Sequence, residues 1–149
     1  MYGSEKLMSI DFEKYLKSVV GNTYFKEWQG LFGIPDYVCF SKQNDEISVV
    51  SFELKLTDWR GAIIQAFRYK SFSDYSYVVL PVETAKKAKE YKKLFEQYEI
   101  GLVSFDDKTY DIIYRPSKVL PYSNRLREIA ENRIRKSRKR AINNVCSII

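Results

Sequence analysis

Three residues, Asp36, Glu53 and Lys55, have the types and spacing that metal-assisted chemistry needs. Glu53 and Lys55 lie in an apolar segment, 47–56, that is typical of a strand. Side chains alternate between the two faces of a strand, so these two share one face, about 7 Å apart along the backbone. Asp36 follows Pro35 and precedes another short strand. Two carboxylates on neighbouring strands, next to an ammonium group, would suit a hard divalent cation and the hydrolysis of a phosphodiester.

Each of these residues also has a purely structural interpretation. Asp36 after Pro35 suits a turn, because Pro-Asp pairs are frequent in turns. Glu53 and Lys55 could form a solvated pair on the wet face of a sheet. Their segment is otherwise rich in valine, isoleucine, phenylalanine and leucine, and charges in a buried strand need a reason. We therefore favour a metal site when the three residues are taken together.

The composition removes most rival chemistries. The 149 residues include no histidine, which excludes Ser-His-Asp triads, Cys-His nucleophiles and zinc sites that use histidine. The two cysteines, Cys39 and Cys146, have no metal-ligand spacing, and Cys39 is expected in the core. No apolar run approaches the roughly 18 residues of a membrane span, and residues 1–8 lack the apolar region of a signal peptide. We therefore expect an intracellular, cytoplasmic protein without a membrane partner.

The hydrophobic pattern predicts the elements that would position the three residues. Helices are expected over residues 9–20, 57–71, 84–98 and 123–143, and strands over residues 24–28, 37–40, 47–56, 76–80, 101–105 and 110–114. Ser9 and Gly21 are the expected caps of the first helix, and Thr57 or Asp58 is the expected N-cap of the second. Residues 41–46 are expected to form a hairpin loop. This order of elements predicts an α/β fold with a mixed central sheet flanked by helices.

Pro35-Asp36 and Glu53-Leu54-Lys55, in the order helix, strand, strand, helix, strand, resemble the PD-(D/E)XK nuclease superfamily over residues 9–116. The resemblance implies a restriction-endonuclease-like core and a Mg²⁺- or Mn²⁺-dependent deoxyribonuclease, and leaves open whether it is an endonuclease or cuts from DNA ends. It implies that Asp36 and Glu53 bind the metal, with the Leu54 carbonyl as a further oxygen ligand. Lys55 would position or help to deprotonate the attacking water and neutralise the phosphate.

Two further groups of residues follow from the same resemblance. Gln65 and Tyr69, four residues apart on one helix face, resemble the Q-x-x-x-Y motif of RecB-type exonucleases, in which the pair binds DNA beside the catalytic centre. Arg60 and Arg68 on the same helix are candidate phosphate contacts. The alternative is a polar helix face with solvated charges and a partly packed tyrosine.

The superfamily often carries an additional acidic residue near the metal on its first helix. Glu13 is the favoured candidate for that position, and Asp11 and Glu27 are alternatives. Asp11 could instead favour the start of the helix through the helix dipole, and Glu13 could be merely solvated.

The net charge of +6 lies in one segment of the chain. Residues 125–140 hold two acidic residues and eight basic ones, namely Arg125, Arg127, Arg133, Arg135, Lys136, Arg138, Lys139 and Arg140. We predict a nuclease-like domain over residues 1–120 and a basic helical extension over residues 121–149 that binds nucleic acid, most simply DNA, with its arginines outward. A frayed tail, a homodimer contact or a protein-docking helix are the alternatives.

The sequence therefore predicts a metal-dependent nuclease that hydrolyses DNA phosphodiester bonds. The alternative is a non-catalytic nucleic-acid-binding protein on a nuclease-like fold, because a fold does not determine a function.

Overall fold

A computed structural model describes residues 2–139 and 145–149 of the chain, with Cys146 and Ser147 described by their backbone alone. Within these residues, six strands form one sheet in the order β1-β2-β3-β4-β5-β6, which is also their order along the chain. The strands are β1 (Tyr24–Lys26), β2 (Tyr37–Gln43), β3 (Glu46–Leu54), β4 (Tyr75–Pro81), β5 (Gly101–Phe105) and β6 (Tyr110–Tyr114). Strands β3, β4 and β5 run parallel, and the other neighbours are antiparallel. The predicted α/β fold with a mixed sheet is confirmed.

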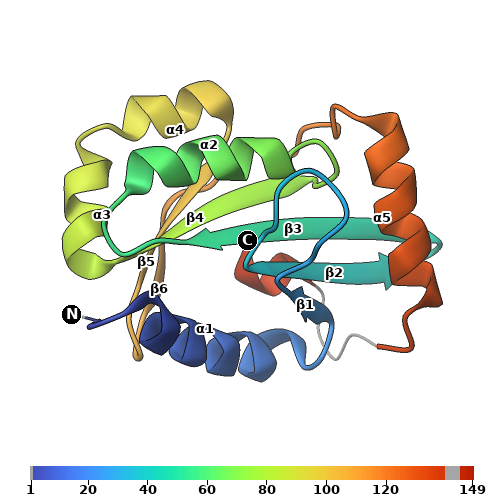
Figure 1. Ribbon diagram of the computed structural model, residues 1–149, viewed down its shortest axis with the longest axis horizontal. Helices are drawn as coiled ribbons and strands as arrows, with labels where there is room; N and C mark the ends of the chain where they lie inside the picture. The colour runs from blue at the N-terminus through green and yellow to red at the C-terminus, as the bar shows by residue number, and fades with distance from the viewer. Residues whose placement is uncertain (1, 140–144) are drawn as a thin grey trace.

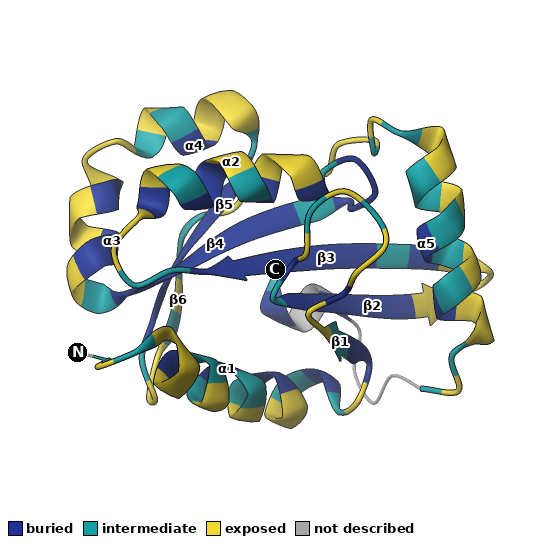
Figure 2. Cartoon of the chain, viewed as in Figure 1, coloured by how far each residue is buried: buried dark blue, intermediate teal, exposed yellow. Residues whose placement is uncertain are grey.

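Helices cover both faces of this sheet (Figure 1). They are α1 (Glu5–Val20), α2 (Trp59–Tyr69), α3 (Val82–Lys89), α4 (Lys92–Tyr98), α5 (Asn124–Lys136) and the short 3₁₀ helix η1 (Val145–Ile148). α1 and η1 pack on one face. On the other face, α2, α3 and α4 cover β4 and β5, and α5 packs on β2 and β3. Strands β2 to β5 are consequently buried over most of their length, whereas the helices keep an exposed side (Figure 2).

The β2–β3 hairpin is tighter than the sequence predicts. The expected loop over residues 41–46 is wrong, because Ser41 to Gln43 continue β2 and Gln43 pairs directly with Glu46. The turn consists only of Asn44 and Asp45, whose φ angles are 50° and 66°. Asparagine and aspartate tolerate this left-handed conformation, and two such residues match the twist of a hairpin. The tight turn fixes the register that brings Asp36 to β3.

The first two helices begin at residues that the cap chemistry explains. α1 begins at Glu5 because the Ser4 side chain accepts a hydrogen bond from the Leu7 N–H, so the expected N-cap at Ser9 is wrong. Gly21 ends the helix with a φ of 67°, as expected. For α2, Asp58 is the N-cap, and its carboxylate accepts from the Gly61 N–H.

The expected single helix over residues 84–98 is wrong, because the chain divides there into α3 and α4. The break falls at Glu90 and Tyr91, and the Tyr91 N–H bonds to the Ala88 carbonyl in a tighter turn. The Tyr91 ring packs at 5.2 Å from the Trp59 ring. This aromatic contact favours the turn over a continuous helix, and local helix propensity could not reveal it.

The basic segment forms α5, which is shorter than predicted. Ser123 caps its start and accepts from the Leu126 N–H. The helix ends at Lys136, because Ser137 adopts an extended conformation. The expected end at residue 143 is therefore wrong; residues 140–144, including Arg140, lie outside the described part of the chain.

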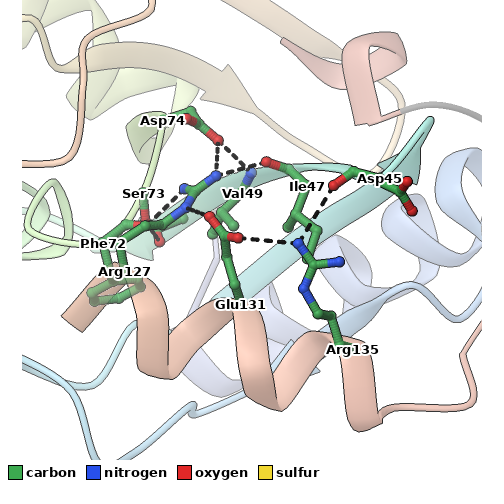
Figure 3. Close-up of polar contacts among 10 residues, drawn as sticks. Asp45, Ile47, Val49, Phe72, Ser73, Asp74, Arg127, Glu131 and Arg135 are labelled. Atoms are coloured by element: carbon green, nitrogen blue, oxygen red, sulfur yellow. Dashed lines mark hydrogen bonds and ion pairs between the residues drawn. The ribbon is translucent and has the colours of Figure 1, made fainter. Parts of the chain in front are cut away.

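Arg127 of α5 points toward the sheet and not outward (Figure 3). Its guanidinium donates to the Asp74 carboxylate, to Glu131 and to the backbone carbonyls of Ile47 and Phe72. Asp74 is 5 % exposed and also accepts from the Val49 N–H at 2.8 Å. The expected outward orientation is therefore wrong for Arg127, whose guanidinium makes four hydrogen bonds inside the protein.

Candidate metal centre

The carboxylates of Asp36 and Glu53 belong to the same end of the β2–β3 pair. Tyr37 pairs with Phe52, so the preceding residue Asp36 lies opposite Glu53. Residues directly opposite on antiparallel strands have Cβ atoms about 4.5–5.5 Å apart. Asp36 Oδ2 accepts a hydrogen bond from the Leu54 N–H at 2.7 Å, which holds this carboxylate against β3. The register thus makes neighbours of two acids that are far apart in sequence.

Tyr69 of α2 holds the second carboxylate. Glu53 is 4 % exposed, and the Tyr69 hydroxyl donates to its Oε1 at 2.6 Å. The same hydroxyl lies 3.0 Å from the carbonyl oxygen of Ile34, in the loop that leads to Asp36. A Cβ on Gly33, whose φ is +76°, would lie 2.9 Å from the Tyr69 ring, so this loop needs glycine to pack there. One tyrosine therefore ties α2, β3 and the loop together.

Both carboxylates resist ionisation in the metal-free fold. Burial raises the pKa of Asp36 to about 6, and the neighbouring acids Glu5 and Glu27 add to the rise. Burial likewise raises the pKa of Glu53 to about 8, and the negative charge of Asp36 is the next cause. The Lys55 ammonium opposes both shifts, so the three predicted residues lie within electrostatic reach of one another. A buried acid and a half-buried acid that share too little positive charge form a site that a cation would stabilise.

The residues present fit a divalent cation. Within the described chain, Asp36 Oδ1 and Glu53 Oε2 accept no hydrogen bond, and neither atom is fully buried. Each carboxylate therefore keeps one oxygen for a ligand while the other is fixed by an N–H or O–H donor. Among the described residues, no group of three or more Cys, Asp or Glu side chains is close enough to hold a metal ion. Two carboxylates, with the predicted Leu54 carbonyl, match Mg²⁺ or Mn²⁺, because Mg²⁺ usually keeps several of its waters.

A hollow of about 440 Å³ opens beside Asp36. Its lining includes Glu5, Ser9 and Glu13 of α1, with Lys26 and Glu27 from the end of β1. The three α1 residues recur every fourth position and so share one face of the helix. Asp36 and Leu54 therefore border this hollow, whereas Glu53 is not among its lining residues.

Glu5 is a site residue that the sequence analysis missed. Its charge raises the pKa of both Asp36 and Glu53, and it lines the same hollow as Asp36. The sequence signal that could have identified Glu5 is its position eight residues before Glu13, which places both on one face of a helix. The predicted helix began at Ser9, whereas α1 begins at Glu5. Glu27 adopts a positive φ of 46° and donates its N–H to the Asp36 carbonyl, so it too lies beside the site.

The two acids predicted on α1 have other partners. Glu13 accepts hydrogen bonds from the Tyr24 hydroxyl at 2.6 Å and from Lys26 at 2.9 Å. Burial raises the pKa of Glu13, but these two bonds outweigh it and hold the pKa below its ordinary value. Asp11 accepts from the Tyr2 hydroxyl. Lys26 thus already neutralises Glu13, whereas the charge of Glu5 acts on the candidate pair.

The predicted substrate-binding residues of α2 lie at different distances from the candidate site. Tyr69 is 1 % exposed and contacts Glu53, while Gln65, one turn earlier on the same face, is half-buried. Arg60 lies over the rings of Trp59 and Tyr91, at 4.4 and 4.8 Å. Arg68 lies 5.6 Å from the ring of Phe32, in the loop that leads to Asp36. Arg68 therefore lies nearer the candidate site than Arg60 does.

The basic residues of the C-terminal segment differ in how far they are exposed. Arg125, Arg135, Lys136 and Arg138 are exposed. Arg133 and Lys139 are half-buried over aromatic rings of the β1 region, and Arg135 bonds to Glu131 and to the Asp45 carbonyl. The exposed side chains of Arg125, Lys136 and Arg138 stay available to a polyanion.

Tyr69→Phe is expected to weaken Mn²⁺ binding about 10-fold at neutral pH, as removal of a hydrogen bond to a ligand typically does. The hydrogen bond from Tyr69 lowers the pKa of Glu53, so its loss leaves Glu53 more often protonated. Calorimetric titration of Mn²⁺ into the variant measures the change. Tyr98→Phe, on an exposed ring, is the matched control, and equal affinities in the two variants would contradict the assignment.

Comparison of the chain with family models, with curated proteins and with solved structures finds no match. None of the described helices is both long and apolar enough to cross a membrane. The functional argument consequently rests on the geometry of the site.

Proposed function

We propose that this protein is a divalent-metal-dependent nuclease that hydrolyses DNA phosphodiester bonds. The observation that carries the proposal is the Asp36–Glu53 pair, in which two adjacent carboxylates at the end of a buried strand each keep a free oxygen beside Lys55. A structural role explains such a pair poorly, because a buried glutamate beside a half-buried aspartate destabilises the fold when both ionise.

The residues of the chain have distinct roles in this proposal. Asp36 and Glu53 would hold Mg²⁺ or Mn²⁺, with the Leu54 carbonyl as a further ligand. When bound, such an ion lowers the pKa of water and stabilises negative charge on a phosphate. Lys55, which is partly exposed, neutralises the scissile phosphate and orients the attacking water. Tyr69 keeps the Glu53 carboxylate in one orientation.

The finer fold assignment is part of the same proposal. In the chain, α1 and β1 are followed by the β2–β3 hairpin, the crossover helix α2 and the parallel strand β4. Asp36 directly precedes β2, Glu53 and Leu54 end β3, and Lys55 directly follows it. This order supports a restriction-endonuclease-like core, and a cytoplasmic location suits a DNA substrate. A non-catalytic nucleic-acid-binding role is the second candidate, favoured by the basic residues that gather on α5.

The test is cleavage of supercoiled, linear and branched DNA by the purified protein. We expect cleavage with Mg²⁺ or Mn²⁺ and none with chelator. Calorimetry in buffers of different ionisation enthalpy should also show proton release when metal binds at neutral pH, because Glu53 must lose its proton. DNA binding without cleavage of any substrate in either metal would favour the non-catalytic role.

A further inference from the structure

A second hollow, of about 590 Å³, lies between β1 and the C-terminal part of α5. Four basic side chains line it, Lys26 of β1 with Arg133, Lys136 and Lys139 of the C-terminal segment. The lining includes one carboxylate, Glu13, which Lys26 and the Tyr24 hydroxyl already bind. The hollow therefore carries excess positive charge, in the segment that holds the net charge of the chain.

Two of these cations are held in place by the floor of the hollow. The Arg133 guanidinium lies 4.3 Å from the centre of the Trp28 ring and donates to the Gln29 carbonyl. The Lys139 ammonium lies 5.2 Å from the Phe25 ring and donates to the Tyr24 carbonyl at 2.8 Å. The Phe25 and Trp28 rings stack at 5.0 Å with an interplanar angle of 1°. Cations fixed in this way lose little side-chain entropy when an anion binds.

The basic hollow adjoins the candidate metal centre. Glu13 and Lys26 line both this hollow and the one beside Asp36. Their ion pair, at 2.9 Å, therefore stands at the junction of the two. An anion that extends along the basic hollow and past this pair reaches the Asp36 carboxylate.

We propose that the basic hollow binds the phosphate backbone of a single nucleic-acid strand and leads that strand to the Asp36–Glu53 site. This inference rests on the proposed nuclease function. Basic side chains from β1, from α5 and from the segment after α5 line the hollow, and each can neutralise a phosphate of the nucleic-acid strand. The volume of the hollow, about 590 Å³, lies within the range of sites for small ligands, so it accommodates a few nucleotides of one strand.

The test measures binding of labelled single-stranded DNA by fluorescence anisotropy, in chelator and across a salt series. The variant Arg133→Gln/Lys136→Gln/Lys139→Gln is compared with Lys86→Gln/Lys87→Gln/Lys89→Gln on the exposed side of α3, which removes the same charge elsewhere. We expect the hollow variant to lose at least about 10-fold in affinity and to reduce the salt slope by about 2, as the loss of three phosphate contacts predicts, while the α3 variant stays near wild type. The single variant Lys136→Gln, at an exposed side chain, repeats the test if the triple variant does not fold.

Equal losses in the two triple variants, or absence of any DNA binding by the wild type, would overturn the proposal. So would equal affinity of the wild type for duplex and single-stranded DNA. The hollow variant should cleave DNA with a raised KM, whereas the α3 variant should cleave DNA with the KM of the wild type. DNA binding is measured in chelator and does not depend on cleavage. A lack of hydrolysis would therefore contradict the proposed nuclease function, and the binding measurement would still test the role of the basic hollow.

Discussion

Glu53→Gln is expected to abolish metal-dependent DNA cleavage and, in the same protein, to stabilise the metal-free fold at alkaline pH. Glutamine keeps the size of the side chain and can still accept from the Tyr69 hydroxyl, but it brings no charge to a divalent cation. We expect the cleavage rate to fall by at least about 10²–10³-fold, the scale on which preorganised electrostatic groups contribute to catalysis.

The gain in stability follows from the pKa of Glu53, which rises from the ordinary 4.5 to about 8 in the folded protein. A raised pKa means that the folded state holds the proton more tightly than the unfolded state. The contribution of protonated Glu53 to the free energy of unfolding is fully present below its pKa in the unfolded chain. It is lost as the pH rises through the folded-state pKa of about 8. The wild type should therefore lose stability between pH ~4.5 and pH ~9, and the uncharged variant should exceed it at the alkaline end by on the order of 5 kcal/mol.

Urea unfolding in chelator, at acidic and alkaline pH, measures this difference. Glu46→Gln, at an exposed position of the same strand, is the matched control and should follow the wild type. Added Mg²⁺ or Mn²⁺ should stabilise the wild type at alkaline pH, because it binds only the folded state, and should not stabilise Glu53→Gln. Parallel stability curves for wild type and variant at every pH would refute the buried-acid assignment.

Arg127→Met is expected to destabilise the fold by about 3–5 kcal/mol, because removal of one partner leaves the other charge buried. Asp74, which is 5 % exposed, would keep only the Val49 N–H as a donor to its bonded oxygen. The carbonyls of Ile47 and Phe72 would lose their side-chain donor as well. Since these bonds join α5 to the sheet, hydrogen exchange of α5 amides should accelerate more than that of the strands.

Arg125→Met, on the exposed side of the same helix, removes the same charge and should change the unfolding free energy little. The double variant Arg127→Met/Asp74→Asn should recover part of the loss, because it no longer leaves a charge unpaired. If Arg127→Met and Arg125→Met unfold at the same urea concentration, the network does not hold α5 in place.

Strong local signals predicted the elements that surround the site. β5 and β6 have the bounds predicted for them, residues 101–105 and 110–114, and the apolar run around Glu53 is β3. Cys39 lies in the core, as expected for a cysteine in an apolar strand. The sequence also predicted that Asp36 and Glu53 lie on neighbouring strands, but the expected loop over residues 41–46 did not predict the register that places them opposite each other.

Long-range contacts could not be read from the pattern. The inward turn of Arg127 depends on Asp74, which lies in a different part of the chain, and charge runs alone suggest an outward face. The role of Glu5 depends on where α1 begins, and helix ends are the least predictable part of a helix. The Tyr69 hydroxyl reaches Glu53 only because α2 crosses back over β3. The sequence alone could not distinguish this role, a hydrogen bond to a proposed metal ligand, from the predicted role of Tyr69 in binding DNA.

The short helix η1 has a consequence for the order in which the protein is made. Val145 and Ile148 are fully or almost fully buried against α1 and the sheet, and the Ile148 carbonyl accepts from the Tyr110 hydroxyl. A ribosome synthesises these residues after every strand and after α5, so a nascent chain that already contains Asp36, Glu53 and Lys55 still lacks part of its core. Full packing around α1, which also supplies Glu5, is then delayed until residue 148 has emerged. A chain whose translation stops before this residue would leave apolar surface of the core exposed, and quality-control proteases would degrade it.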